Sequence, residues 1–119
     1  MSTALPMIIS EYLSAADRGD VDAMVACFIE DAVVVDEDEE HRGHAAIRRW
    51  RETVATAYEY TVEVRGSDAR DAVDGLERYD VFTHLEGNFP GGAVDLTHRF
   101  GLRDGRIARM EIVPTEATS

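Results

Sequence analysis

Apolar residues in the first half of the chain recur every three or four positions, the spacing that places them on one face of an α-helix. Gly19 is expected to end a first helix and Asp20 to cap a second. The first stripe runs from about residue 4 to 17 and consists of Leu5, Ile8, Ile9, Tyr12, Leu13 and Ala16. The second consists of Val21, Met24, Val25 and Phe28.

A short run of β-branched residues, "AVVVD" at 32–36, follows these helices and predicts a strand. A third helix is expected over roughly 44–58, with apolar residues on one side and charged residues on the other. The apolar side consists of Ile47, Trp50, Val54 and Ala57, and the charged side of Arg48, Arg49, Arg51 and Glu52.

From Tyr58 onward the hydrophobic period changes to two, which is the period of β-strands. The segments "YTVEVRG", "ERYDVFTHLEG", "AVDLTHRFGL" and "RIARMEIV" predict a four-strand antiparallel meander, with "RDG" as its last tight turn. The second strand has Tyr79, Val81, Thr83 and Leu85 on one face and Asp80, Phe82, His84 and Glu86 on the other. One face of the third strand carries Val94, Leu96, His98, Phe100 and Leu102.

This order of elements predicts an α+β fold in which a curved antiparallel sheet packs against three N-terminal helices. The chain has 119 residues without a linker or repeat, so residues 1–119 are expected to form one domain. Because three short helices do not fill a strongly bent sheet, we expect a cavity at its open end.

Charge and composition narrow the functional classes. The chain has 24 acidic residues and 12 arginines but no lysine, and its formal charge is −12. This charge repels phosphates, which argues against nucleic acid and anionic membranes as partners. No apolar run approaches the roughly 20 residues of a membrane span, and "MSTALPMIISEYL" lacks the positive start of a signal peptide. A cytoplasmic protein is therefore expected, with the single Cys27 as a buried thiol.

The segments "EYLSAADRGDVDAMVACFIEDAVVVD", "HRGHAAIRRW" and "GNFPGGAVDLTHRFGLRDGRIARMEI" resemble, in order and spacing, the SnoaL-like branch of the nuclear transport factor 2-like superfamily. The resemblance covers nearly the whole chain. It implies a cone-shaped α+β domain with a deep apolar pocket and a dimer formed through the outer sheet face. It says little about the reaction, because this fold hosts isomerases, cyclases, dehydratases, epoxide hydrolases and binders without catalytic activity.

Within that superfamily the pattern is most similar to ketosteroid isomerases, which have a tyrosine in the first helix and an aspartate base at the end of the first strand. Tyr12 and Asp36 stand at the matching positions. Those enzymes add a protonated aspartate that helps to hold the enolate oxygen. Here the matching position is Leu96, and the neighbouring Asp95 is expected to point to the opposite face.

Three residues are candidates for catalysis. Asp36 ends an apolar strand, where partial desolvation would strengthen it as a base; the alternative is a solvated turn. Tyr12, on the apolar stripe of the first helix, could donate to an oxyanion or be a core tyrosine. His98 could replace the missing donor or pair with Asp36 through a ligand or water, or it could be a core histidine.

A further set of residues is expected to contact a ligand in the cavity or to plug it, with ordinary core packing as the alternative for most of them. The set consists of Phe28, Trp50, Tyr58, Phe82, His84, Phe89, Leu96, Phe100 and Met110. The orientation of His84 is uncertain from its strand.

No metal site or cofactor is expected. The loop "DEDEEHRGH" contains two aspartates and two histidines, but an EF-hand counted from Asp36 would have His41 and Ile47 where glycine and glutamate are required. Nothing in the sequence forces three zinc ligands to converge. The acidic run 37–40 is interpreted as the solvated tip of a hairpin. Asp36, which precedes this run, is then the one carboxylate of the loop that is a functional candidate.

Two functional hypotheses follow. The first is an isomerase or cyclase that moves a proton next to the carbonyl of a small, apolar compound, with Asp36 as general base and Tyr12 and His98 steadying the enolate. The second is a small-molecule binder or protein-interaction module without catalysis, since the catalytic set is incomplete at Leu96. Under either hypothesis a homodimer burying roughly 1,600 Å² is expected.

Overall fold

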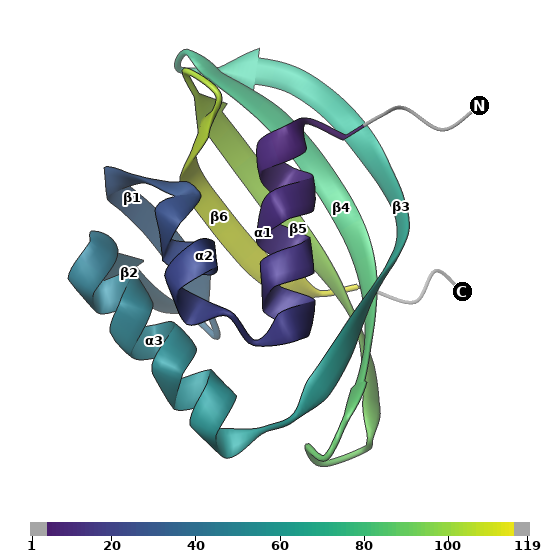
Figure 1. The fold of residues 1–119 in the computed structure, drawn as a ribbon. Coiled ribbons are helices and arrows are strands. Elements are labelled where there is room, and N and C mark those ends of the chain that lie inside the picture. The colour runs from purple at the N-terminus through teal and green to yellow at the C-terminus, as the bar shows by residue number, and fades with distance from the viewer. Residues whose placement is uncertain (1–4, 116–119) are drawn as a thin grey trace.

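The computed structural model describes residues 5–115, except for the side chains of residues 55 and 56. Within that range three helices precede or interrupt the strands of one sheet (Figure 1). The elements are α1 (Met7–Arg18), α2 (Val21–Ala26), β1 (Phe28–Asp36), β2 (Glu39–Arg42), α3 (His44–Ala57), β3 (Tyr60–Val73), β4 (Leu76–Gly87), β5 (Ala93–Arg103) and β6 (Arg106–Pro114). The predicted α+β fold is confirmed.

The first two helices meet at the predicted break. Gly19 closes α1 in the left-handed conformation, with φ of 70°, a geometry that costs glycine little. The Asp20 carboxylate caps α2 by accepting the backbone N–H of Ala23 at 3.1 Å. Phe28 does not extend the second helix as predicted, because it begins β1 and pairs with Ile107 of β6.

The six strands form one sheet in the order β2-β1-β6-β5-β4-β3. The meander predicted from β3 to β6 is confirmed, and every neighbouring pair is antiparallel except β1 and β6, which are parallel. The sequence interpretation missed β2. Glu37 and Asp38 have positive φ in the exposed turn between β1 and β2, which confirms an exposed acidic hairpin, although residues 39–40 of the run belong to β2 and not to the tip.

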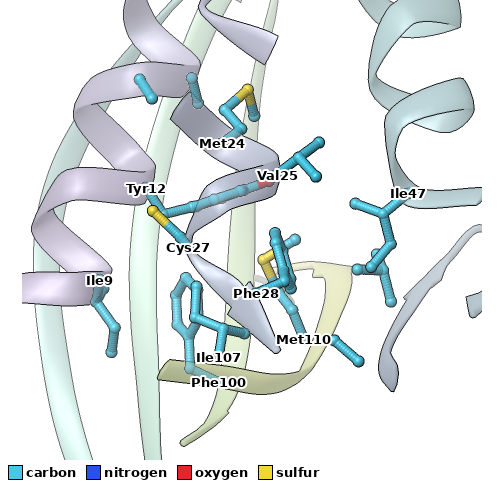
Figure 2. Packing of buried hydrophobic residues seen from close by; sticks show 14 of the residues in the cluster. Ile9, Tyr12, Met24, Val25, Cys27, Phe28, Ile47, Phe100, Ile107 and Met110 are labelled. Carbon is cyan, nitrogen blue, oxygen red and sulfur yellow. The ribbon is translucent and has the colours of Figure 1, made fainter. Parts of the chain in front are cut away.

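The sheet curves around the helices and gives the domain a concave and a convex face. Figure 1 shows α1 lying across the sheet in front of β5, while α3 lies beside β1 and β2. The concave face carries the apolar core, where Tyr12 packs edge-on against Phe28 and Phe100 with ring centroids 5.4 and 6.0 Å apart (Figure 2). No helix within residues 5–115 is long and apolar enough to cross a membrane.

Candidate functional site

Asp36 lies on the concave face of the sheet. It pairs with Ile112 of β6, which in turn pairs with His98 of β5, so the three residues form one cross-strand row. Its carboxylate is partly buried and accepts the indole N–H of Trp50 at 3.1 Å. Asp36 is therefore held inside the curve of the sheet, while the acidic residues that follow it are exposed.

Arg51 is the main residue that the sequence interpretation missed. It was assigned to the charged side of the third helix, but its side chain is only 6% exposed. Position 51 lies four residues after Ile47 and three before Val54, so it borders the apolar stripe, and this spacing was the available signal. The guanidinium donates to the Tyr60 hydroxyl and lies 4.7 Å from the centre of the Trp50 ring.

Tyr12 reaches the same region from α1. Its side chain is 1% exposed, and burial raises the pKa of its phenol above the ordinary value, an effect that nearby Arg51 partly offsets. Tyr60 and Asp36 raise the pKa of Tyr12 further, which places all four groups within electrostatic reach of one another. The phenol therefore stays neutral at physiological pH and can act as a hydrogen-bond donor.

His98 is buried on the concave face beside Phe100, with their rings nearly parallel and their centroids 6.0 Å apart. Its Nδ1 shares a hydrogen bond of 3.3 Å with the hydroxyl of Thr83. Burial lowers the pKa of His98 to about 4, and the positive charge of Arg51 contributes to that shift. His98 is consequently neutral at pH 7, with one ring nitrogen able to donate and the other to accept.

These groups make up what we call the interior polar cluster: Tyr12, Asp36, Trp50, Arg51, Tyr60, Thr83 and His98. The cluster combines a carboxylate that can accept a proton, neutral phenol and imidazole donors, and a buried cation. Such a set can remove a proton from carbon and stabilise the oxygen on which negative charge develops. The three predicted catalytic residues all belong to this cluster.

The other predicted ligand contacts divide into several groups. Phe28, Phe100 and Met110 belong to the packed core, and Leu96 is partly buried on the concave face. Tyr58, at the end of α3, is 40% exposed and meets Phe89 of the β4–β5 loop edge-on at 6.1 Å. Neither of these last two residues is buried.

The structure does not bring Phe82 and His84 to the interior, because both point to the convex face of β4, as their alternation with Val81 and Thr83 requires. His84 lies between two carboxylates, with Nδ1 2.6 Å from Asp95 and Nε2 2.9 Å from Glu86. The prediction that Asp95 faces away from the interior is confirmed by this contact.

Two grooves mark the outer surface. The first has a volume of about 490 Å³ and lies on the convex face over Gly101, bordered by Arg78 and Arg109. The second has a volume of about 510 Å³ and lies along α1 and α2 near Cys27. Neither groove is lined by residues of the interior polar cluster. The predicted apolar cavity inside the sheet therefore stays a prediction.

The histidines of the acidic loop have structural contacts. His41 stacks on Trp50 with a centroid distance of 5.5 Å, and His44 Nε2 donates to the Phe28 carbonyl at 2.8 Å. Within residues 5–115, no three side chains of histidine, cysteine, aspartate or glutamate are grouped so that they could hold a metal ion.

A comparison with known protein families identifies the family to which this domain belongs. The SnoaL-like domain matches residues 9–110, which is most of the chain. This chain belongs to the SnoaL-like domain family. The expected family and the cone-shaped α+β fold are thereby confirmed, whereas the more specific pattern of ketosteroid isomerases at Tyr12 and Asp36 stays a prediction.

Solved structures agree with this assignment of the SnoaL-like domain. A Sinorhizobium meliloti protein provisionally assigned as a polyketide cyclase is 38% identical, with a TM-score of 0.83 over 92% of this chain and 95% of that one. SalBIII, an epoxide hydrolase/cyclase-like enzyme in pyran ring formation in the polyether salinomycin, is 27% identical, with a TM-score of 0.74 over 92% and 88%.

The fold also occurs within a larger protein. The orange carotenoid protein of Anabaena (Nostoc) sp. PCC 7120, in a structure that binds canthaxanthin, matches 98% of this chain over 38% of its own length. Its TM-score is 0.81 at 19% identity, a similarity that concerns the fold alone. Comparison with curated protein sequences gives no match.

Proposed function

We propose that this SnoaL-like domain is an isomerase or cyclase that transfers a proton at the carbon next to a carbonyl group. The observation that carries the proposal is the position of Asp36, a partly buried carboxylate oriented by Trp50 beside neutral and cationic donors. The similarity to a provisional polyketide cyclase and to SalBIII supports a cyclase, and the proton transfer beside a carbonyl rests on the geometry of Asp36.

In the proposed reaction the Asp36 carboxylate removes a proton from the carbon beside the carbonyl. The electron pair of the C–H bond moves to the carbonyl oxygen and produces an enolate, which Tyr12 and His98 stabilise by donating hydrogen bonds. An isomerase then returns the proton to a different carbon. In a cyclase the enolate carbon attacks a second carbonyl, and Asp36 returns its proton to the new alkoxide.

The proposal is tested with an assay that does not require the natural substrate. Small apolar ketones and 1,3-dicarbonyl compounds are incubated with the protein in deuterated water, and incorporation of deuterium next to the carbonyl is measured by mass spectrometry. Asp36→Asn should reduce protein-dependent exchange by about 10²–10⁴-fold, the usual contribution of a general base. Exchange at the unchanged rate in Asp36→Asn would remove this residue from the mechanism.

Asp38→Asn is the matched control for that experiment. Asp38 lies two residues further along in the exposed hairpin turn, where asparagine tolerates its positive φ. It loses the same charge without touching the interior polar cluster, so its exchange rate should equal that of the unmodified protein.

The alternative is a binder without catalysis, and the position of Leu96 favours it. Leu96 occupies the concave face where the resemblance to ketosteroid isomerases would require an acid. Titration with a panel of apolar carbonyl compounds separates the two functions. Binding without deuterium exchange for every compound would support the binder.

We also propose that the convex sheet face pairs two copies of the chain. Opposite charges already alternate there, with Arg70 2.9 Å from Asp80 and Arg99 3.3 Å from Glu111. A second copy could extend this alternation across an interface. Light scattering should give the mass of a dimer at micromolar concentration, and a monomer under those conditions would refute the pairing.

A further inference from the structure

Burial of the Arg51 guanidinium costs free energy, and the proposed proton transfer does not require this buried charge. The guanidinium belongs to a side chain that is only 6% exposed. Removing a charge from water is costly, and buried cations are therefore normally paired with an anion and fully hydrogen-bonded. The partners of Arg51 show whether this requirement is met.

The surroundings of Arg51 provide neither a paired anion nor a complete set of hydrogen bonds. Its terminal nitrogen donates to a neutral acceptor, the Tyr60 hydroxyl, and its positive charge lies over the Trp50 ring. No carboxylate within residues 5–115 makes an ion pair with it. The buried Nε has no hydrogen-bond partner.

Asp36 is a carboxylate whose charge acts on Arg51, yet its hydrogen bond is to the indole N–H of Trp50. Desolvation works against the charged guanidinium, but Tyr12, Tyr60 and Asp36 together hold the pKa of Arg51 above its ordinary value, so the buried side chain stays a cation. The site thus contains a carboxylate at the N–H edge of the Trp50 ring and a guanidinium over the face of that ring, without a direct bond between them. An arginine in this state is ready to receive an anion.

We infer that Arg51 binds a carboxylate group of the ligand, so that the substrate is an apolar carbonyl compound carrying an acid. The inference rests on the proposed function for the presence of a ligand in the interior. A carboxylate matches the planar fork of guanidinium and accepts two parallel N–H bonds, including the one from Nε. The hydroxyl of Tyr60, a residue that is only partly buried, is the partner that the carboxylate would displace.

This arrangement also orients the substrate. Arg51 attracts the ligand carboxylate and the negative charge of Asp36 repels it. The acid group is therefore directed to the face of the Trp50 ring where Arg51 lies, and the reacting C–H bond to the indole N–H edge where Asp36 lies. The charge pattern therefore separates the anchor from the base. A neutral ester of the same compound would lose the anchor while keeping the apolar contacts.

The test compares acids with their methyl esters. 4-Phenylbutyrate and 2-naphthoate, each with its methyl ester, are titrated by calorimetry, and Trp50, the only tryptophan, reports on the site by fluorescence. The unmodified protein should bind each acid at least about tenfold more tightly than its ester, the ratio that 1.4 kcal/mol provides. Arg51→Met should reduce this ratio to about one.

Arg49→Met is the control, because Arg49 lies on the same helix but is exposed. It makes the same change in net charge, and its acid-to-ester ratio should equal that of the unmodified protein. Equal binding of acid and ester by the unmodified protein, absence of binding of both acids, or a preference retained in Arg51→Met would each overturn the inference. The ratio is measured within one variant, so a change in overall stability does not produce it.

Asp36→Asn separates this inference from the proposed reaction. The variant should lose deuterium exchange but keep its preference for acids, since Arg51 is unchanged. Preference for acids together with no exchange in the unmodified protein would refute the enzyme and keep the anion site. Exchange without the preference would refute the anion site alone.

Discussion

His98 should make the stability of the fold depend on pH in a defined direction. Its pKa is about 4 in the folded protein and 6.5 in the unfolded chain. Above pH 6.5 both states are neutral at this residue. Between 6.5 and about 4 the unfolded chain takes up a proton that the folded protein does not, so the free energy of unfolding decreases as the pH falls.

The size of the effect follows from the two pKa values. At about 1.4 kcal/mol per pH unit, the difference between 6.5 and about 4 corresponds to about 3 kcal/mol. Single domains of this size have total stabilities of about 5–15 kcal/mol. Protonation of one buried imidazole should therefore remove a substantial part of the stability of the domain.

The assay is urea unfolding, followed by Trp50 fluorescence, at a series of pH values for the unmodified protein and His98→Gln. Carboxylates titrate in both proteins, so the difference in unfolding free energy isolates His98. This difference should change by about 3 kcal/mol in favour of His98→Gln between about pH 7 and pH 4. A difference that does not vary with pH would refute the burial of a neutral imidazole.

His84→Gln provides a comparison of opposite sign. Hydrogen bonds to Asp95 and then Glu86 raise the pKa of His84 above its ordinary value. Its contribution is therefore present below pH 6.5 and is lost as the pH rises through the folded pKa. Replacing His84 should remove stability at mildly acidic pH, in contrast to replacing His98.

Three substitutions test local features by circular dichroism during urea unfolding. Asp20→Ala removes the cap of α2 and should cost about 1 kcal/mol, while Asp20→Asn should cost little; equal losses would contradict capping. Gly87→Ala places a methyl group 2.6 Å from Tyr60 Cβ and against the Glu59 carbonyl, and should cost about 1–3 kcal/mol. Gly66→Ala, whose nearest contact is Phe82 at 3.7 Å, should fold with a smaller loss. Trp50→Phe leaves Asp36 without its donor and should cost about 1–3 kcal/mol; an unchanged midpoint would show that this bond contributes nothing.

Much of the fold could be predicted because it depends on neighbours along the chain. Gly19 and Asp20 end and begin helices through local conformation and a local hydrogen bond. The alternation of Val81 and Phe82 determines which side chain faces the core, since successive residues of a strand point to opposite faces. The same rule placed His98 on the concave face.

The candidate site depended on contacts between distant residues. Phe28 had the spacing of a helix, and only its pairing with β6 made it the start of a strand. Arg51 lies at the border of an apolar stripe, where the sequence permits either exposure or burial, and Tyr60 and Trp50 cover it. Periodicity determines the direction in which a side chain points. The strands and helices packed against that side chain determine its exposure to solvent and its charge partners, and therefore its chemistry.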